Sequence, residues 1–89
     1  MKPLLCLDFD GVIHSYTSGW KGADVVSDPP VDGALKFIDC AREYFIVAIF
    51  SSRSAQVGGK HAMADWLRAH LCAAFGNARA MAILSDILS

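Results

Sequence analysis

The sequence predicts an α/β domain with a parallel sheet, and three segments carry this prediction. Residues 4–7 and 45–50 are short continuous apolar runs, which are typical of strands buried on both faces. Residues 31–44 between them alternate apolar and charged side chains with the period of an amphipathic helix. A strand, a helix and a strand in this order form a βαβ unit with parallel strands and a right-handed crossover.

The composition of each element supports this unit. The first strand is Leu4-Leu5-Cys6-Leu7 and ends in acidic residues, whereas the second, 45–50, is rich in β-branched and aromatic side chains. Pro29 and Pro30 suit the first turn of the helix, where a missing N–H costs no hydrogen bond. The core-facing side of this helix is expected to carry Val31, Leu35, Ile38, Ala41 and Phe45.

The last third of the chain predicts helices. Residues 61–75 form one amphipathic pattern, which Gly76 and Asn77 end. Residues 78–88 fit a second helix better than a strand, although 81–84 alone could form a short strand. The first of these helices is expected to turn toward the core Met63, Trp66, Leu67, Leu71 and Ala74.

Length and charge restrict the class of protein. The 89 residues predict a single domain over 1–89, and the 54% hydrophobic content argues against a disordered chain. Eight basic against nine acidic residues give a net charge of −1, so we expect no nucleic-acid or membrane partner. Asp8 interrupts the first apolar run too early for a signal peptide, and no run approaches the ~20 residues of a membrane span. We therefore expect a cytoplasmic protein.

Reactive side chains follow both predicted strands. Asp8 and Asp10 follow the first strand, and Ser51 follows the second. The carboxyl ends of parallel strands meet at one edge of a sheet, where open α/β folds place their ligand sites. We therefore expect these three side chains to converge in one cleft.

The segments around these residues resemble the first two motifs of the haloacid dehalogenase-like (HAD) phosphohydrolases. Leu7-Asp8-Phe9-Asp10-Gly11-Val12 matches the first motif, and Phe50-Ser51-Ser52-Arg53 matches the second. The resemblance implies a Rossmann-like, three-layer fold with a parallel sheet, in which helices follow the βαβ core. It also implies a magnesium-dependent phosphohydrolase that acts on a phosphorylated substrate through an aspartyl-phosphate. The loop over 12–28 is too short for a cap domain, so a capless enzyme is expected.

The same resemblance assigns roles to the strand-end residues. Asp8 would be the nucleophile and a ligand of Mg²⁺. Asp10 would give a proton to the leaving oxygen and later activate water, and its backbone carbonyl would also bind Mg²⁺. Ser51 would hydrogen-bond the phosphoryl group, with Ser52 as a further substrate-binding residue. Gly11 would let the chain turn away sharply after the strand.

Three further residues have two interpretations each. Arg53 either contacts substrate phosphate or is a solvated surface side chain. Lys60 either supplies the basic residue of the third family motif or is simply solvated in its glycine-rich loop, 54–60. Trp20 either contacts substrate or packs the 12–28 loop against the core, and the packing role is favoured.

The end of the chain departs from the family pattern. The fourth motif places acids after a later strand, and the one late acid, Asp86, continues an apolar period, which predicts a helix-surface position. The resemblance therefore implies an incomplete domain that lacks part of its metal site and hydrolyses phosphate esters poorly.

Two other functions stay open. The first is a non-catalytic HAD-like remnant that binds a partner or forms a homo-oligomer through an open sheet edge. The second is a nucleotide-binding domain that uses residues 51–54 as an anion-binding turn. The absence of a glycine-rich phosphate-binding motif weighs against the second function.

Overall fold

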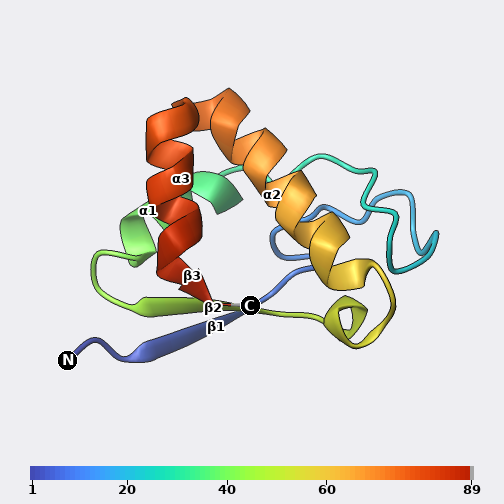
Figure 1. Ribbon diagram of the computed structural model, residues 1–89, viewed down its shortest axis with the longest axis horizontal. Coiled ribbons are helices and arrows are strands. Elements are labelled where there is room, and N and C mark those ends of the chain that lie inside the picture. The colour runs from blue at the N-terminus through green and yellow to red at the C-terminus, as the bar shows by residue number, and fades with distance from the viewer. Residues whose placement is uncertain (89) are drawn as a thin grey trace.

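The computed structural model describes residues 1–88 and confirms a mixed α/β architecture with a parallel sheet. In chain order the elements are β1 (Leu4–Asp8), α1 (Ala34–Ala41), β2 (Ile46–Phe50), the short 3-10 helix η1 (Ser52–Ala55), α2 (Gly59–Phe75), α3 (Asn77–Asp86) and β3 (Ile87–Leu88). The strands lie in the order β1-β2-β3 (Figure 1). No helix among the described residues is long and apolar enough to cross a membrane.

The predicted βαβ unit is present. β1 and β2 pair in parallel over their whole length, from Leu4 opposite Ile46 to Asp8 opposite Phe50. The helix between them begins at Ala34 and ends at Ala41, so it is shorter than the predicted 31–44.

Placing Pro29 and Pro30 in the first turn of this helix was wrong. Pro30 forms a bridge with His14 instead, and the carbonyl of Pro29 accepts from the N–H of Ser15. The segment before α1 is extended because its hydrogen bonds go to the loop after β1. The chain turns into α1 at Gly33, whose φ of 80° is one that glycine adopts without strain.

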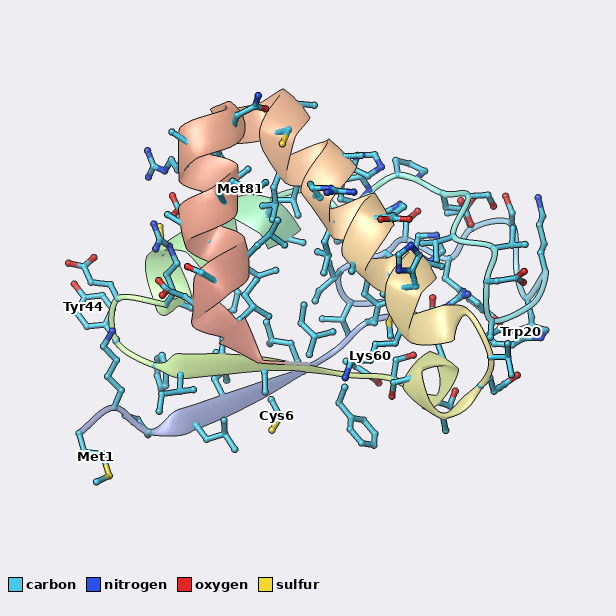
Figure 2. All side chains as sticks on the ribbon, viewed as in Figure 1. Met1, Cys6, Trp20, Tyr44, Lys60 and Met81 are labelled. Atoms are coloured by element: carbon cyan, nitrogen blue, oxygen red, sulfur yellow. The ribbon has the colours of Figure 1, made fainter. Side chains whose placement is uncertain are left out.

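All three α-helices cover the same face of the sheet (Figure 1). On this face Val47 and Ile49 are buried in a core to which the helices contribute Ile38, Leu67, Leu71 and Ile83. On the opposite face Leu4, Cys6, Ile46 and Phe50 are exposed, and Cys6 points away from the helices (Figure 2). The expected burial of both faces is therefore wrong for the described residues, which form two layers rather than three.

The two C-terminal helices were predicted with small errors at their ends. α2 begins at Gly59, two residues before the expected start, and ends before Gly76 as predicted. Of its expected core residues, Ala74 is exposed and the other four are buried. α3 confirms the preferred helix, but the last described residues leave it and pair with β2 as β3.

The segment over 12–28 contains no helix or strand, as expected, yet it is well anchored. Its isolated bridges join His14 to Asp10 and Pro30. The indole N–H of Trp66 on α2 donates to the carbonyl of Asp28 over 2.9 Å, which ties the end of this segment to the helical layer. The second predicted loop, 54–60, is largely helical, because η1 and α2 take up most of it.

Candidate functional site

The carboxyl ends of β1 and β2 lie side by side, as predicted. Asp8 is the last residue of β1, is exposed, and pairs with Phe50, the last residue of β2. Ser51 follows at once and is buried. The sheet thus places the expected nucleophile and the expected phosphate contact on neighbouring strand ends, with Asp8 open to solvent.

Asp10 lies two residues beyond β1, after the buried Phe9 and before Gly11, whose φ is 85°. Its side chain is 20% exposed, and both carboxylate oxygens accept hydrogen bonds. Arg53 donates to them through Nε over 2.8 Å and through Nη2 over 3.0 Å. His14 donates through Nδ1 over 2.8 Å. These three bonds hold Asp10 in a single orientation.

Arg53 is fully buried, with 0% exposure. A solvated surface position, one of its two expected roles, is therefore wrong. The expected contact with substrate phosphate has no support either, because the guanidinium is occupied by protein acceptors. Beyond Asp10, its Nη1 donates over 3.0–3.1 Å to the carbonyl oxygens of Gly22, Ala23 and Val25.

Trp20 covers this buried cation from outside. The Arg53 guanidinium carbon lies 4.8 Å from the centre of the Trp20 ring, within the range of a cation–π contact. Trp20 itself is 48% exposed (Figure 2). The favoured sequence-based role, packing the loop against the core, is therefore wrong: Trp20 stacks on the Arg53 guanidinium and lies outside the hydrophobic core.

His14 is a site residue that the sequence analysis missed. It is 1% exposed, and its Nε2 accepts from the backbone N–H of Asp28 over 3.0 Å. Because Nε2 accepts, the proton of a neutral ring lies on Nδ1, which donates to Asp10. The one sequence signal was a histidine four residues after a motif acid, in a loop where spacing alone predicts no contact.

Hydrogen bonds and nearby charges lower the pKa values of Asp10 and Asp28. Burial raises the pKa of Asp10, but hydrogen bonds from Arg53 and His14 and the positive charge of Arg53 outweigh this and hold the pKa below its ordinary value. Hydrogen bonds from the Ser18 hydroxyl and backbone N–H lower the pKa of Asp28 in the same way. At neutral pH Asp10 is therefore a carboxylate, the form that accepts a proton.

Ser51 is held by the backbone of the same arginine. Its Oγ accepts from the N–H of Arg53 over 3.1 Å, as the N-cap of η1. This bond uses a lone pair of the hydroxyl oxygen, and the side chain is buried. The convergence of Asp8, Asp10 and Ser51 in one cleft stays a prediction. Ser52 is exposed at the start of η1.

Lys60 lies in the first turn of α2 and is exposed (Figure 2). It lines a groove of about 710 Å³ between α2, α3 and the sheet, whose apolar walls include Ile49, Met63, Leu67, Met81, Leu84 and Ile87. Asp86, the acid weighed for the fourth motif, ion-pairs with Arg42 at the end of α3. Its predicted helix-surface position is confirmed.

The oxygen ligands that Mg²⁺ prefers are present at the strand ends in part. The Asp8 carboxylate and the Asp10 carbonyl are two hard oxygen donors, and Mg²⁺ commonly binds one or two protein carboxylates while substrate phosphate and water complete its octahedron. Within residues 1–88 no three His, Cys, Asp or Glu side chains gather where they could share an ion. Within the described residues the strand ends therefore supply two candidate oxygen donors and no complete protein-made metal site.

Comparison of the chain with protein-family models, with curated proteins and with solved structures finds no match.

Proposed function

We propose that this protein is a magnesium-dependent phosphohydrolase of the HAD type, with a Rossmann-like fold. One observation carries the proposal. Two motif segments that resemble those of one enzyme family stand on the ends of adjacent parallel strands, with Asp8 directly opposite the residue before Ser51. The three cysteines are unpaired, which agrees with a cytoplasmic location.

In this proposal Asp8 attacks the phosphorus atom of a phosphate ester. A bond forms between Asp8 Oδ and phosphorus, the bond from phosphorus to the ester oxygen breaks, and an aspartyl-phosphate results. The ester oxygen leaves with the electron pair of the broken bond and takes its proton from water. The expected role of Asp10 as the acid of this step is not part of the proposal, because an ionised carboxylate has no proton to give. Hydrolysis of the aspartyl-phosphate then needs a base to take a proton from the attacking water. In this proposal Asp10, held in place as a carboxylate by Arg53 and His14, accepts that proton and passes it to solvent. Ser51 would donate its hydroxyl proton to a phosphoryl oxygen.

Magnesium would be held by the Asp8 carboxylate and the Asp10 carbonyl, and would offset the repulsion between Asp8 and the anionic substrate. Two unit charges ~4 Å apart repel by ~4 kcal/mol at an effective dielectric of 20. The chain itself places Asp8 at the carboxyl end of β1 and orients the Asp10 carboxylate through hydrogen bonds from His14 and Arg53.

The test is release of phosphate from an aryl phosphate, with and without magnesium. It is run on this chain and on a C-terminally extended form, because residues 1–88 supply only two candidate oxygen donors to a metal ion. Asp8→Asn should lower turnover by about a thousandfold or more, the loss expected from ~4 kcal/mol of transition-state stabilisation. Asp65→Asn, which removes an exposed carboxylate on α2, is the matched control and should change nothing. Turnover that survives Asp8→Asn would reject the nucleophile.

A second candidate is favoured by the edge of the sheet. β1 has β2 as its one neighbour in the sheet of the described chain, so its other edge is free to pair with a second copy. This candidate is a non-catalytic module that forms a homo-oligomer. Sedimentation equilibrium distinguishes the two: concentration-dependent dimers without phosphatase activity in either form favour the module, and an active monomer favours the enzyme.

A further inference from the structure

We propose that Arg53 is the positioning residue of the site, which sets both Asp10 and Ser51 while making no contact with substrate. The inference rests on the proposed phosphohydrolase function. It goes beyond that function by assigning a role to a residue that the motif pattern would place on the substrate.

The first step is the match between the Arg53 fork and the Asp10 carboxylate. Nε and Nη2 each bind a different carboxylate oxygen, at 2.8 and 3.0 Å. Such a two-point contact sets the plane as well as the position of the carboxylate, which a lysine cannot do. His14, in the loop after β1, donates a third hydrogen bond to Asp10. Asp10 therefore has little freedom to rotate.

The second step is that the backbone of Arg53 sets Ser51. The Arg53 N–H donates to Ser51 Oγ, so the same residue orients the proposed proton carrier through its side chain and the proposed phosphate contact through its main chain. Gly59 lets α2 approach the Arg53 backbone closely, because a Cβ at this position would lie 1.9 Å from the carbonyl oxygen of Arg53. The start of α2 thus packs directly against the Arg53 backbone.

The side chain of Arg53 is enclosed by protein groups and does not contact substrate in this proposal. Its Nη1 donates to the carbonyl oxygens of Gly22, Ala23 and Val25, and Trp20 stacks over the guanidinium. With no exposed surface, the side chain cannot reach a phosphate without breaking these contacts. The cost of burying the charge is offset by the Asp10 carboxylate and by hydrogen bonds from Nη1 to backbone carbonyl oxygens. Arg53 therefore acts through the residues it holds.

The experiment separates positioning from substrate contact by comparing kcat with KM. Arg53→Lys, which keeps the charge but loses the fork, should lower kcat for an aryl phosphate about a hundredfold, within the range of a misplaced proton carrier. KM and the affinity for orthovanadate with magnesium should stay within about threefold. Arg68→Lys is the matched control, because Arg68 is exposed and its ion-pair partner is the exposed Asp65, so both parameters should be unchanged. The assays use whichever form of the chain turns over.

Two results would overturn the inference: a tenfold rise in KM with kcat intact, which marks a substrate contact, or full activity in Arg53→Lys. Chemical rescue adds a second measurement. In Arg53→Ala, guanidinium ion at millimolar concentration should restore part of kcat and ammonium should not. Failure of both ions to restore activity in a folded Arg53→Ala protein would also count against the inference.

A measurement without catalysis keeps this inference apart from the proposed function. In the wild-type protein the ring nitrogens of His14 should show a protonated Nδ1 and an unprotonated Nε2 by ¹⁵N NMR. Arg53→Lys should shift these resonances because Asp10 loses its orientation, and Arg68→Lys should not. If neither form of the protein hydrolyses phosphate, the proposed function fails, and the His14 resonances alone decide whether Arg53 positions Asp10.

Discussion

The two faces of the sheet have similar amino acids and different surroundings. On the covered face Val47 and Ile49 are buried under three helices, whereas on the open face Leu4 and Phe50 are 61% and 72% exposed. Both sets are apolar side chains of the same two strands. The apolar composition of the strands would allow either face to be buried. The placement of the helices decides which face is covered.

The residues at the strand ends differ in exposure in the same way as the two faces of the sheet. Asp8 continues the exposed alternation of Leu4 and Cys6, whereas Ser51 and Arg53 belong to the buried side. The expected nucleophile is thus open to solvent, and the residues that would assist it are held from within. This difference leads to expected effects on stability, which the following experiments measure from the largest effect to the smallest.

Arg53→Leu should lower the free energy of unfolding by about 3–5 kcal/mol, because it leaves Asp10 partly buried without its partner and three carbonyl oxygens without a donor. Arg68→Leu on the surface of α2 should change it by less than about 0.5 kcal/mol. Urea unfolding followed by circular dichroism measures both. Equal effects would mean that the buried arginine contributes no more than a surface one.

Leu71→Ala on the covered side should lower the free energy of unfolding by about 2–5 kcal/mol, because Leu71 is fully buried in the core. Leu4→Ala makes the same chemical change on the open face and should have an effect below about 0.5 kcal/mol. The pair is a direct test of the comparison. A large loss in Leu4→Ala would show that the open face is covered in solution.

Asp39 should make stability depend on acid pH. A hydrogen bond from Arg79 is the main cause that lowers its pKa; burial opposes it, and Arg42 adds a second hydrogen bond. Because the folded-state pKa is depressed, the contribution is complete above the unfolded value near 3.9 and is lost as the pH falls through the folded-state pKa. Arg79 is 58% exposed, so we expect at most about 1 kcal/mol. Thermal unfolding of wild type and Asp39→Asn from pH 6 to pH 2 should show the two stabilities converging.

Phe50→Thr on the open face should have the smallest effect on stability, within about 0.5 kcal/mol, because the ring is mostly exposed. It should lower self-association, since a large apolar side chain leaves an uncovered sheet surface. Sedimentation velocity over a range of concentrations measures this. Val57→Thr, at a fully exposed apolar side chain outside the sheet, is the control and should leave association unchanged.

Much of the fold follows from local sequence patterns. The runs that became β1 and β2 and the helical period after Lys60 were enough to predict two parallel strands and two C-terminal helices. The pairing of motif segments at adjacent strand ends followed from the βαβ topology, because parallel strands present their carboxyl ends at one edge. These features depend on short-range periodicity, which a single sequence contains.

The tertiary structure alone decided which face of the sheet is covered and where Arg53 goes. Composition makes both strand faces equally apolar, and only the positions of the helices distinguish them. An arginine after a motif serine reads as a substrate contact or a solvated side chain. It is buried because carbonyl oxygens of 22–25, some thirty residues earlier, lie within reach of the same guanidinium as Asp10. Such contacts depend on how distant segments meet, and no local pattern contains that information.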